Sequence, residues 1–138
     1  MAKQQKWLVA YDCIEKIGKG GNANIFHVKE KTTHQHLALK ELYNLSSEKK
    51  TRFANEIDIA SKNASITPGI IPIISFNKSE CWYTMPIAQS ITEYISQNNC
   101  SVKTIVEGVI QLSETLETLH KNGITHRDIK PSNIYYYK

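Results

Sequence analysis

The sequence predicts an α+β fold, in which a small antiparallel sheet with one helix precedes a helical segment. Two observations predict it. Up to about residue 90, short runs alternate apolar and polar residues between turn formers, which is typical of strands. After that point, apolar residues recur at intervals of three and four, which is typical of helices. The 138 residues suffice for one domain or for part of a larger one.

Composition and charge argue against several classes of protein. Hydrophobic residues make up 41% and charged residues 22%, as in globular rather than disordered chains. The net charge of +4 has no long Lys/Arg run, so we expect no nucleic-acid partner, although a nucleotide triphosphate would suit a mildly basic groove. No window approaches the ~20 apolar residues of a membrane span, so we expect no membrane partner. Three widely spaced cysteines and no signal peptide predict a reducing, cytoplasmic setting, and the oligomeric state stays open.

The first half predicts a sheet with one helix. Strands are expected at residues 11–18, 24–31, 36–43, 73–76 and 81–85. In the first of them Tyr11, Cys13 and Ile17 occupy alternate positions, and the Gly-rich run GKGGNA joins it to the second as a hairpin. Residues 46–63 place apolar side chains at helical spacing, with Ser46 or Ser47 as the N-cap.

The second half predicts two helices. Ser90 and Glu93 form an S-x-x-E capping box, so a short helix should begin there. Residues 101–123 form the strongest helical pattern, with Ser101 able to cap its start and Gly123 at the position of a C-cap glycine. A helix this long and apolar should be buried, and we expect its partners to lie outside this sequence.

The run IGKGGNANI is a candidate phosphate-binding turn. Gly18 and Gly20 give G-x-G, and Ala23 stands where a third glycine is expected. Without side chains, backbone N–H groups of such a turn can approach phosphate oxygens. The run is not a P-loop, because no G-K-[ST] leads into a helix, and a strand rather than a Rossmann helix follows it. The alternative is an ordinary tight hairpin.

Lys40 is a candidate binding residue at the end of the apolar run LALK. It lies on the same face of its strand as Ala38. A lysine on a buried face needs an anionic partner, and Glu56 in the predicted helix is the best candidate. The alternative is a solvated lysine beside a surface glutamate.

Residues 126–133, HRDIKPSN, crowd ionisable and amide groups into one loop after the long helix. Asp128 can accept a hydroxyl proton, Lys130 can stabilise phosphate charge, and Asn133 can offer a carbonyl oxygen to a hard cation. A polar loop without function is the alternative, and it does not explain this density. The Tyr-rich run that follows is expected to form a strand.

HRDIKPSN resembles the catalytic loop of eukaryotic-type Ser/Thr protein kinases, whose pattern is H-R-D-x-K-P-x-N. The order of the other pieces agrees: a Gly-rich loop, an A-x-K strand, a helix with Glu and a long helix that leads into the loop. The resemblance covers roughly residues 11–138. It implies a kinase-like fold with an N-terminal extension at 1–10, the N-lobe and hinge at 11–88, and an incomplete C-lobe at 89–138.

The resemblance implies ATP and Mg²⁺ as cofactors and a protein Ser or Thr hydroxyl as substrate. Lys40 would bind the α- and β-phosphates and pair with Glu56. Asp128 would orient the hydroxyl and accept its proton, and Lys130 in the D-x-K pattern is similar to Ser/Thr rather than tyrosine kinases. Asn133 would hold Mg²⁺.

The resemblance also implies further nucleotide contacts. These would be Gly18, Lys19, Gly20, Gly21 and Asn22 over the phosphates, Ile25 and Ala38 over the adenine, Met85 as gatekeeper, and Pro86 and Ala88 in the hinge. The family often has Glu where Pro86 stands, but the backbone carbonyl that faces adenine remains.

The D-F-G motif that follows the catalytic loop in this family is not in the sequence, so we expect a partial catalytic domain. One alternative is a non-catalytic regulator that binds nucleotide or a partner, although the intact Lys40, Glu56, Asp128 and Asn133 argue against a decayed site. Another is a small-molecule phosphotransferase of the same fold, which the D-x-K-P pattern favours less.

The 138-residue chain alone should therefore transfer negligible phosphate, because the family's second metal ligand is not in its sequence. Incubation with Mg·ATP and a basic protein substrate is expected to give no label above a Lys40→Ala control. Clear transfer above that control contradicts this expectation.

Overall fold

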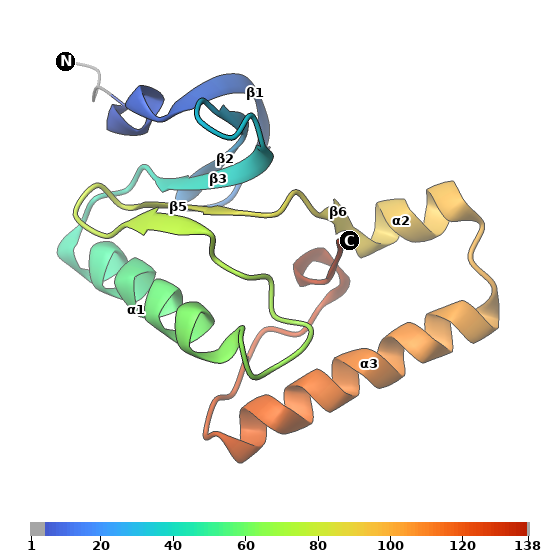
Figure 1. Ribbon diagram of the computed structural model, residues 1–138. Coiled ribbons are helices and arrows are strands. Elements are labelled where there is room, and N and C mark those ends of the chain that lie inside the picture. Colours follow the sequence, from blue (N-terminus) through green and yellow to red (C-terminus); the bar gives the residue numbers. More distant parts are fainter. Residues whose placement is uncertain (1–4, 138) are drawn as a thin grey trace. The chain divides into compact units, whose positions relative to one another are not determined.

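The computed structural model describes residues 5–137, which divide into two compact units (Figure 1). The first comprises the described residues up to Lys62 together with Ile71–Ile87. The second comprises Asn63–Ile70 and the described residues from Ala88 onward. Strands gather in the first unit and helices dominate the second, which confirms the predicted α+β class.

The first unit is built on a five-stranded antiparallel sheet with the strand order β1-β2-β3-β5-β4. All five predicted strands are confirmed, with ends that differ by a few residues. Their bounds are β1 (Tyr11–Lys19), β2 (Ala23–Glu30), β3 (His36–Leu42), β4 (Ser75–Asn77) and β5 (Trp82–Met85).

Strand β1 departs from the simple alternation that its sequence suggests. Only Tyr11 is buried in it, while Cys13 and Ile17 are exposed. The pairing with β2 shifts register between Cys13 and Glu15 and again between Lys16 and Gly18. Such bulges interrupt the period of two, and β1 also lies at the sheet edge, where one side has no neighbouring strand.

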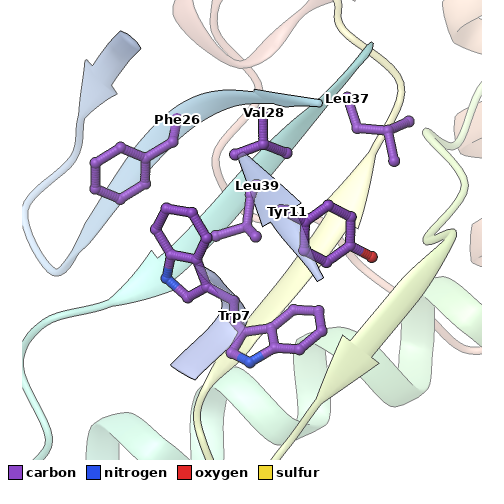
Figure 2. Close-up of a cluster of buried hydrophobic side chains, with 7 residues drawn as sticks. Trp7, Tyr11, Phe26, Val28, Leu37 and Leu39 are labelled. Carbon is purple, nitrogen blue, oxygen red and sulfur yellow. The ribbon is translucent and has the colours of Figure 1, made fainter. Parts of the chain in front are cut away.

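One face of the sheet carries an aromatic-rich core (Figure 2). The short 3₁₀ helix η1 (Lys6–Val9) brings Trp7 onto this face, where it is 1% exposed and its ring centroid lies 5.3 Å from that of Phe26. Residues 1–10 were predicted as an N-terminal extension. Within its described part, Trp7 packs against the sheet, and residues 1–4 lie outside the described residues. The cluster comprises Trp7, Tyr11, Phe26, Val28, Leu37, Leu39 and Trp82.

Helix α1 (Ser47–Asn63) belongs to the other face of the sheet. Phe53 and Ile57, one helical turn apart, are buried in one cluster with the side chains of Leu42, Cys81 and Tyr83. The Ser46 hydroxyl accepts a hydrogen bond from the Lys49 N–H at 3.4 Å, so Ser46 is the cap of the two serines considered.

The second unit contains two helices and a two-stranded sheet. Its elements are β6 (Gln89–Ser90), α2 (Ile91–Asn98), α3 (Val102–Lys121), the 3₁₀ helix η2 (Pro131–Asn133) and β7 (Tyr135–Tyr136). Strands β6 and β7 pair antiparallel, which confirms a strand after the HRDIKPSN loop.

Both helices begin as their sequences predict, and α3 also ends as predicted. The Ser90 hydroxyl accepts from the Glu93 N–H at 3.3 Å, and the Ser101 hydroxyl accepts from the Thr104 N–H at 3.1 Å. Gly123 has φ +74°, and the N–H groups of Gly123 and Ile124 donate back to carbonyls of the last turn of α3 at 3.0 Å each. This is the Schellman arrangement that the position of Gly123 predicts.

The apolar face of α3 is largely uncovered. Val102, Val106 and Val109 are 78%, 50% and 56% exposed, and only Leu119 is buried. Within residues 5–137, therefore, the expected burial of this helix is confined to its last turns. No helix in this range is long and apolar enough to cross a membrane.

The loop before β4 contacts α3 at Gly69. The Thr115 hydroxyl donates to the Pro68 carbonyl at 2.7 Å, and a Cβ on Gly69 would lie 2.2 Å from Thr115 Oγ1. Gly69 also has φ +95°, a backbone conformation that residues other than glycine rarely adopt. Gly108 in α3, by contrast, has nothing within 4 Å of such an added atom.

Gly69→Ala should therefore destabilise the chain by about 2 kcal/mol or more, through backbone strain and the clash with Thr115. Gly108→Ala is the matched control and should raise stability by up to about 1 kcal/mol, because alanine favours helix. Urea denaturation of both variants measures the effect. A Gly69→Ala midpoint equal to that of wild type contradicts the described contact.

Candidate active site

The antiparallel register places several predicted residues on one face of the first unit's sheet. Lys40 pairs with Ile25 of β2 on one side and with Tyr83 of β5 on the other. Ala38 pairs with Met85 in the same way. Directly opposed residues share a face, so these side chains all lie on the face that carries α1.

Lys40 and Glu56 form the ion pair that the sequence predicted. Lys40 Nζ lies 2.5 Å from Glu56 Oε1, and the two side chains are 24% and 43% exposed. The ammonium also lies 5.9 Å from the ring centroid of Phe53 and 5.5 Å from that of Tyr83, within the range of cation–π attraction. The lysine is thus held by one carboxylate and two aromatic rings.

Tyr83 is a site residue that the sequence analysis missed. Its hydroxyl donates to Glu56 Oε1 at 2.6 Å, and the residue is only 6% exposed. Burial, and then the charge of Glu56, raise the pKa of Tyr83 well above its ordinary value. The available signal was strand alternation, since Tyr83 stands two residues before Met85 and so shares its face.

The Gly-rich run closes the hairpin between β1 and β2 and is fixed to a neighbouring segment. The Gly20 N–H donates to the Ala23 carbonyl at 2.8 Å. Tyr43, just after β3, donates through its hydroxyl to the Gly21 carbonyl at 2.7 Å and through its N–H to the Asn22 carbonyl at 3.0 Å. Tyr43 is the second residue missed, because nothing in the local pattern marks a contact across 22 residues.

The glycines of this run are not required by the chain itself. Neither Gly20 nor Gly21 has a positive φ. An added Cβ at Gly20 would come no nearer than 3.7 Å to Ala23 O, and one at Gly21 would meet nothing within 4 Å. Gly18 is similar, since its added Cβ would make ordinary contact with Ile25 at 3.5 Å. Close approach of a ligand to the backbone remains as a reason for them.

A cavity of about 270 Å³ lies between the Gly-rich run and α1 in the first unit. Three cationic side chains and one carboxylate line it, so an anion would be attracted there. The lining residues are Gly20, Gly21, Asn22, Ala23, Lys40, Leu42, Lys49, Arg52, Phe53 and Glu56.

The residues predicted as gatekeeper and hinge lie at and just after the end of β5. Met85 is half-buried and packs against the cluster beneath α1. Pro86 is also half-buried. Ala88 is half-buried too and belongs to the second unit. The predicted hinge, therefore, falls where the chain passes from one unit to the other.

The second unit contains the other predicted group, in the loop before η2. Asn133 Nδ2 donates to the backbone carbonyl of Asp128 at 2.9 Å and to its carboxylate Oδ2 at 3.0 Å. Lys130 Nζ lies 3.2 Å from the same Oδ2. Asp128, Lys130 and Asn133 are thus brought together as the sequence predicted.

The local backbone explains this arrangement. Arg127 has φ +65°, which turns the chain sharply before Asp128, and the Asp128 N–H donates to His126 Nδ1 at 3.2 Å. Pro131 stands at the start of η2, where its fixed φ suits a helical turn and its missing N–H is not needed. The turn then brings Asn133 back over Asp128.

The Asp128 carboxylate is stabilised in its charged form. Hydrogen bonds from Lys130 and then from Asn133 lower the pKa of Asp128 below its ordinary value. Within residues 5–137, Asn133 Oδ1 accepts no hydrogen bond, so this oxygen is available to a cation. The described residues contain no group of three or more His, Cys, Asp or Glu side chains that could hold a metal ion.

Comparison with known proteins agrees with this geometry. A family model described as "Protein kinase domain" matches residues 11–138. The serine/threonine-protein kinase PknD of Chlamydia muridarum is 29% identical, and PknD of Chlamydia trachomatis serovar L2b is 31% identical. Each alignment covers 90% of this chain and 15% of the relative. The serine/threonine-protein kinase shk1/pak1 of Schizosaccharomyces pombe is 32% identical over 90% of this chain and 19% of its own length.

The chain belongs to the protein kinase domain family. Members of this family are in general transferases that use ATP. The antiparallel sheet with one helix, followed by helices, is consistent with a kinase N-lobe and part of a C-lobe. The chain spans less than a fifth of the length of these curated relatives.

The loop geometry predicts a pH dependence for Asp128. Its pKa, measured by carboxyl ¹³C NMR in metal-free buffer, should lie below the ordinary ~3.9. Lys130→Ala should raise it, because the Lys130 hydrogen bond is the largest cause of the shift. A carboxyl whose pKa is lower folded than unfolded stabilises the fold above its unfolded pKa, and that contribution is lost as the pH falls through the folded pKa.

Lys103→Ala is the control for this measurement, because Lys103 pairs with Glu107 on α3 and not with the loop. It should leave the Asp128 titration unchanged. An Asp128 titration that is the same in the wild type and in Lys130→Ala contradicts the contact at 3.2 Å.

Proposed function

We propose that these residues serve a protein kinase domain that transfers the γ-phosphate of ATP to Ser and Thr hydroxyls of other proteins. The observation that carries the proposal is the Lys130 ammonium 3.2 Å from the Asp128 carboxylate, in a loop with the D-x-K pattern. Membership of the protein kinase domain family supports it, as do the printed names of the relatives.

The first unit supplies the nucleotide-binding residues of this proposal. Lys40, held by Glu56, donates to the α- and β-phosphates, and the Gly18–Asn22 run, which includes Lys19, covers the phosphates with backbone N–H groups. The cationic lining of the cavity suits this use. Ile25 and Ala38 contact the adenine, with Met85, Pro86 and Ala88 at its edge.

Asn133 fits the way proteins hold Mg²⁺ in such sites. Its Nδ2 is used by Asp128, which leaves the Oδ1 oxygen for the ion. Mg²⁺ usually takes one or two protein oxygens and completes its shell with water and substrate phosphates. When bound, the ion neutralises charge that develops on the phosphates.

Asp128 orients the accepting hydroxyl in this proposal. Because its pKa is lowered, it is ionised at neutral pH and accepts a hydrogen bond from the Ser or Thr hydroxyl. A weak base of this kind takes the proton late, as phosphoryl transfer proceeds. Lys130 stabilises the negative charge of the transferred group from beside Asp128.

The wider assignments follow from the same proposal. Residues 11–88 act as the N-lobe and hinge, and residues 89–138 as part of the C-lobe, after an extension at 1–10. The partners are ATP and a protein substrate. A cytoplasmic setting suits the thiols of Cys13, Cys81 and Cys100, which are free.

Two variants separate binding from transfer. Lys40→Ala should weaken Mg·ATP binding about tenfold or more, because a hydrogen-bonded charge on the phosphates is lost. Asp128→Asn should keep Mg·ATP affinity within about twofold and lower transfer by about 10²-fold or more. Calorimetry measures the first effect, and label from [γ-³²P]ATP on peptides that carry Ser, Thr or Tyr measures the second.

Label is expected on Ser and Thr but not on Tyr. Label on Tyr alone contradicts the proposed specificity. Mg·ATP binding without transfer in the wild type would favour a nucleotide-binding regulator, and wild-type binding equal to that of Lys40→Ala overturns the proposal altogether.

A further inference from the structure

Three elements of the first unit meet at a single oxygen atom. Glu56 Oε1, on α1, accepts a hydrogen bond from Lys40 Nζ of β3 at 2.5 Å and another from the Tyr83 hydroxyl of β5 at 2.6 Å. Lys40 and Tyr83 are direct partners across the β3–β5 ladder, so both donors approach from the same face of the sheet. The Glu56 carboxylate is therefore held from two neighbouring strands.

The Lys40–Glu56 pair alone would be weakly fixed. Both side chains are long and partly exposed, at 24% and 43%, and such pairs lose much of their attraction to solvent screening and side-chain entropy. Tyr83 differs because it is 6% exposed and its ring packs in the cluster beneath α1, 5.4 Å from the Phe53 ring. A hydroxyl on a rigid, buried ring is a fixed donor.

The Tyr83 hydroxyl is chemically suited to act as a constant hydrogen-bond donor to Glu56. A buried hydroxyl needs a partner, and within residues 5–137 the Glu56 carboxylate is the acceptor for Tyr83. Burial, and then the charge of Glu56, raise the pKa of Tyr83 above its ordinary value, so the phenol keeps its proton at neutral pH. The donor and the acceptor are thus present together at neutral pH.

We propose that Tyr83 is a positioning residue for nucleotide binding: its hydroxyl orients the Glu56 carboxylate, and the carboxylate in turn fixes the Lys40 ammonium toward the phosphates. The inference rests on the proposed function of Lys40 as a phosphate ligand. Tyr83 itself does not touch the nucleotide in this scheme. The effect of its hydroxyl passes through Glu56, whereas its ring also lies 5.5 Å from the Lys40 ammonium. A change that removes the hydroxyl and keeps the ring therefore separates positioning from packing and from the ring contact.

Tyr83→Phe removes the hydroxyl and keeps the ring. In the 138-residue chain it should weaken Mg·ATP binding about three- to tenfold, the range expected when a hydrogen bond to a charged group is lost indirectly. In a Glu56→Ala background the same change should have no further effect, because the group it acts through is gone. Tyr11→Phe is the matched control, since it removes a hydroxyl from a buried tyrosine on the opposite face of the same sheet.

A second measurement does not depend on nucleotide. The ¹⁵N signal of the Lys40 ammonium group should be narrow in the wild type, where Glu56 is fixed, and broadened or lost by exchange in Tyr83→Phe. The Tyr11→Phe chain should give the wild-type signal. Thermal melts of each variant establish that it is folded before either measurement is interpreted.

The outcomes separate this proposal from the proposed function. If wild type binds Mg·ATP no better than Lys40→Ala, the proposed function fails, and the ammonium signal alone decides the role of Tyr83. An unchanged ammonium signal in Tyr83→Phe overturns the inference. So does an affinity loss of equal size in the Glu56→Ala background, or an equal loss in Tyr11→Phe.

Discussion

The packing of α1 against the sheet is the constraint on which the phosphate-binding pair depends. Phe53 and Ile57 are buried and fix the rotation of the helix, and Glu56 then projects beside Lys40. Fully burying one such apolar side chain contributes about 1.5–3 kcal/mol. An exposed ion pair contributes about 0–1 kcal/mol, which is less than the burial of Phe53 or of Ile57 contributes. The pair therefore does not hold the helix in place, and the helix holds the pair.

The two groups of candidate site residues, one in each unit, are built in different ways. The group formed by Lys40, Glu56 and Tyr83 needs β3, β5 and α1, and β5 is far from β3 in the sequence. A slip of one residue in strand register would turn Lys40 to the opposite face of the sheet, which carries the Trp7 cluster. The Asp128 group is formed within eight residues, by the left-handed turn at Arg127 and the 3₁₀ turn that begins at Pro131. A local motif can specify the second group, whereas only the folded sheet can specify the first.

This difference explains what could be predicted from the sequence. Strand alternation, serine caps and the glycine after α3 are local signals, and each led to the observed element. The bulges of β1 have no such signal, so the exposure of Cys13 and Ile17 was not foreseen. The contacts of Tyr43 and Tyr83 are also non-local, since each hydroxyl reaches a partner more than twenty residues away.

Some residues have features that contacts within the chain explain, and others have features that such contacts do not explain. The second kind are candidates for ligand binding. Gly69 and Gly123 are explained by positive φ angles, whereas neither Gly20 nor Gly21 has a positive φ, and an added Cβ would fit at both without a clash. Asn133 uses its amide nitrogen to hold Asp128, and within residues 5–137 its Oδ1 oxygen accepts no hydrogen bond. Asp128 is exposed, yet hydrogen bonds from Lys130 and Asn133 favour its charged form. Glycines without a backbone reason, an oxygen without a donor and a carboxylate held ready in its charged form all fit a site that a phosphate, a metal ion and a hydroxyl would complete.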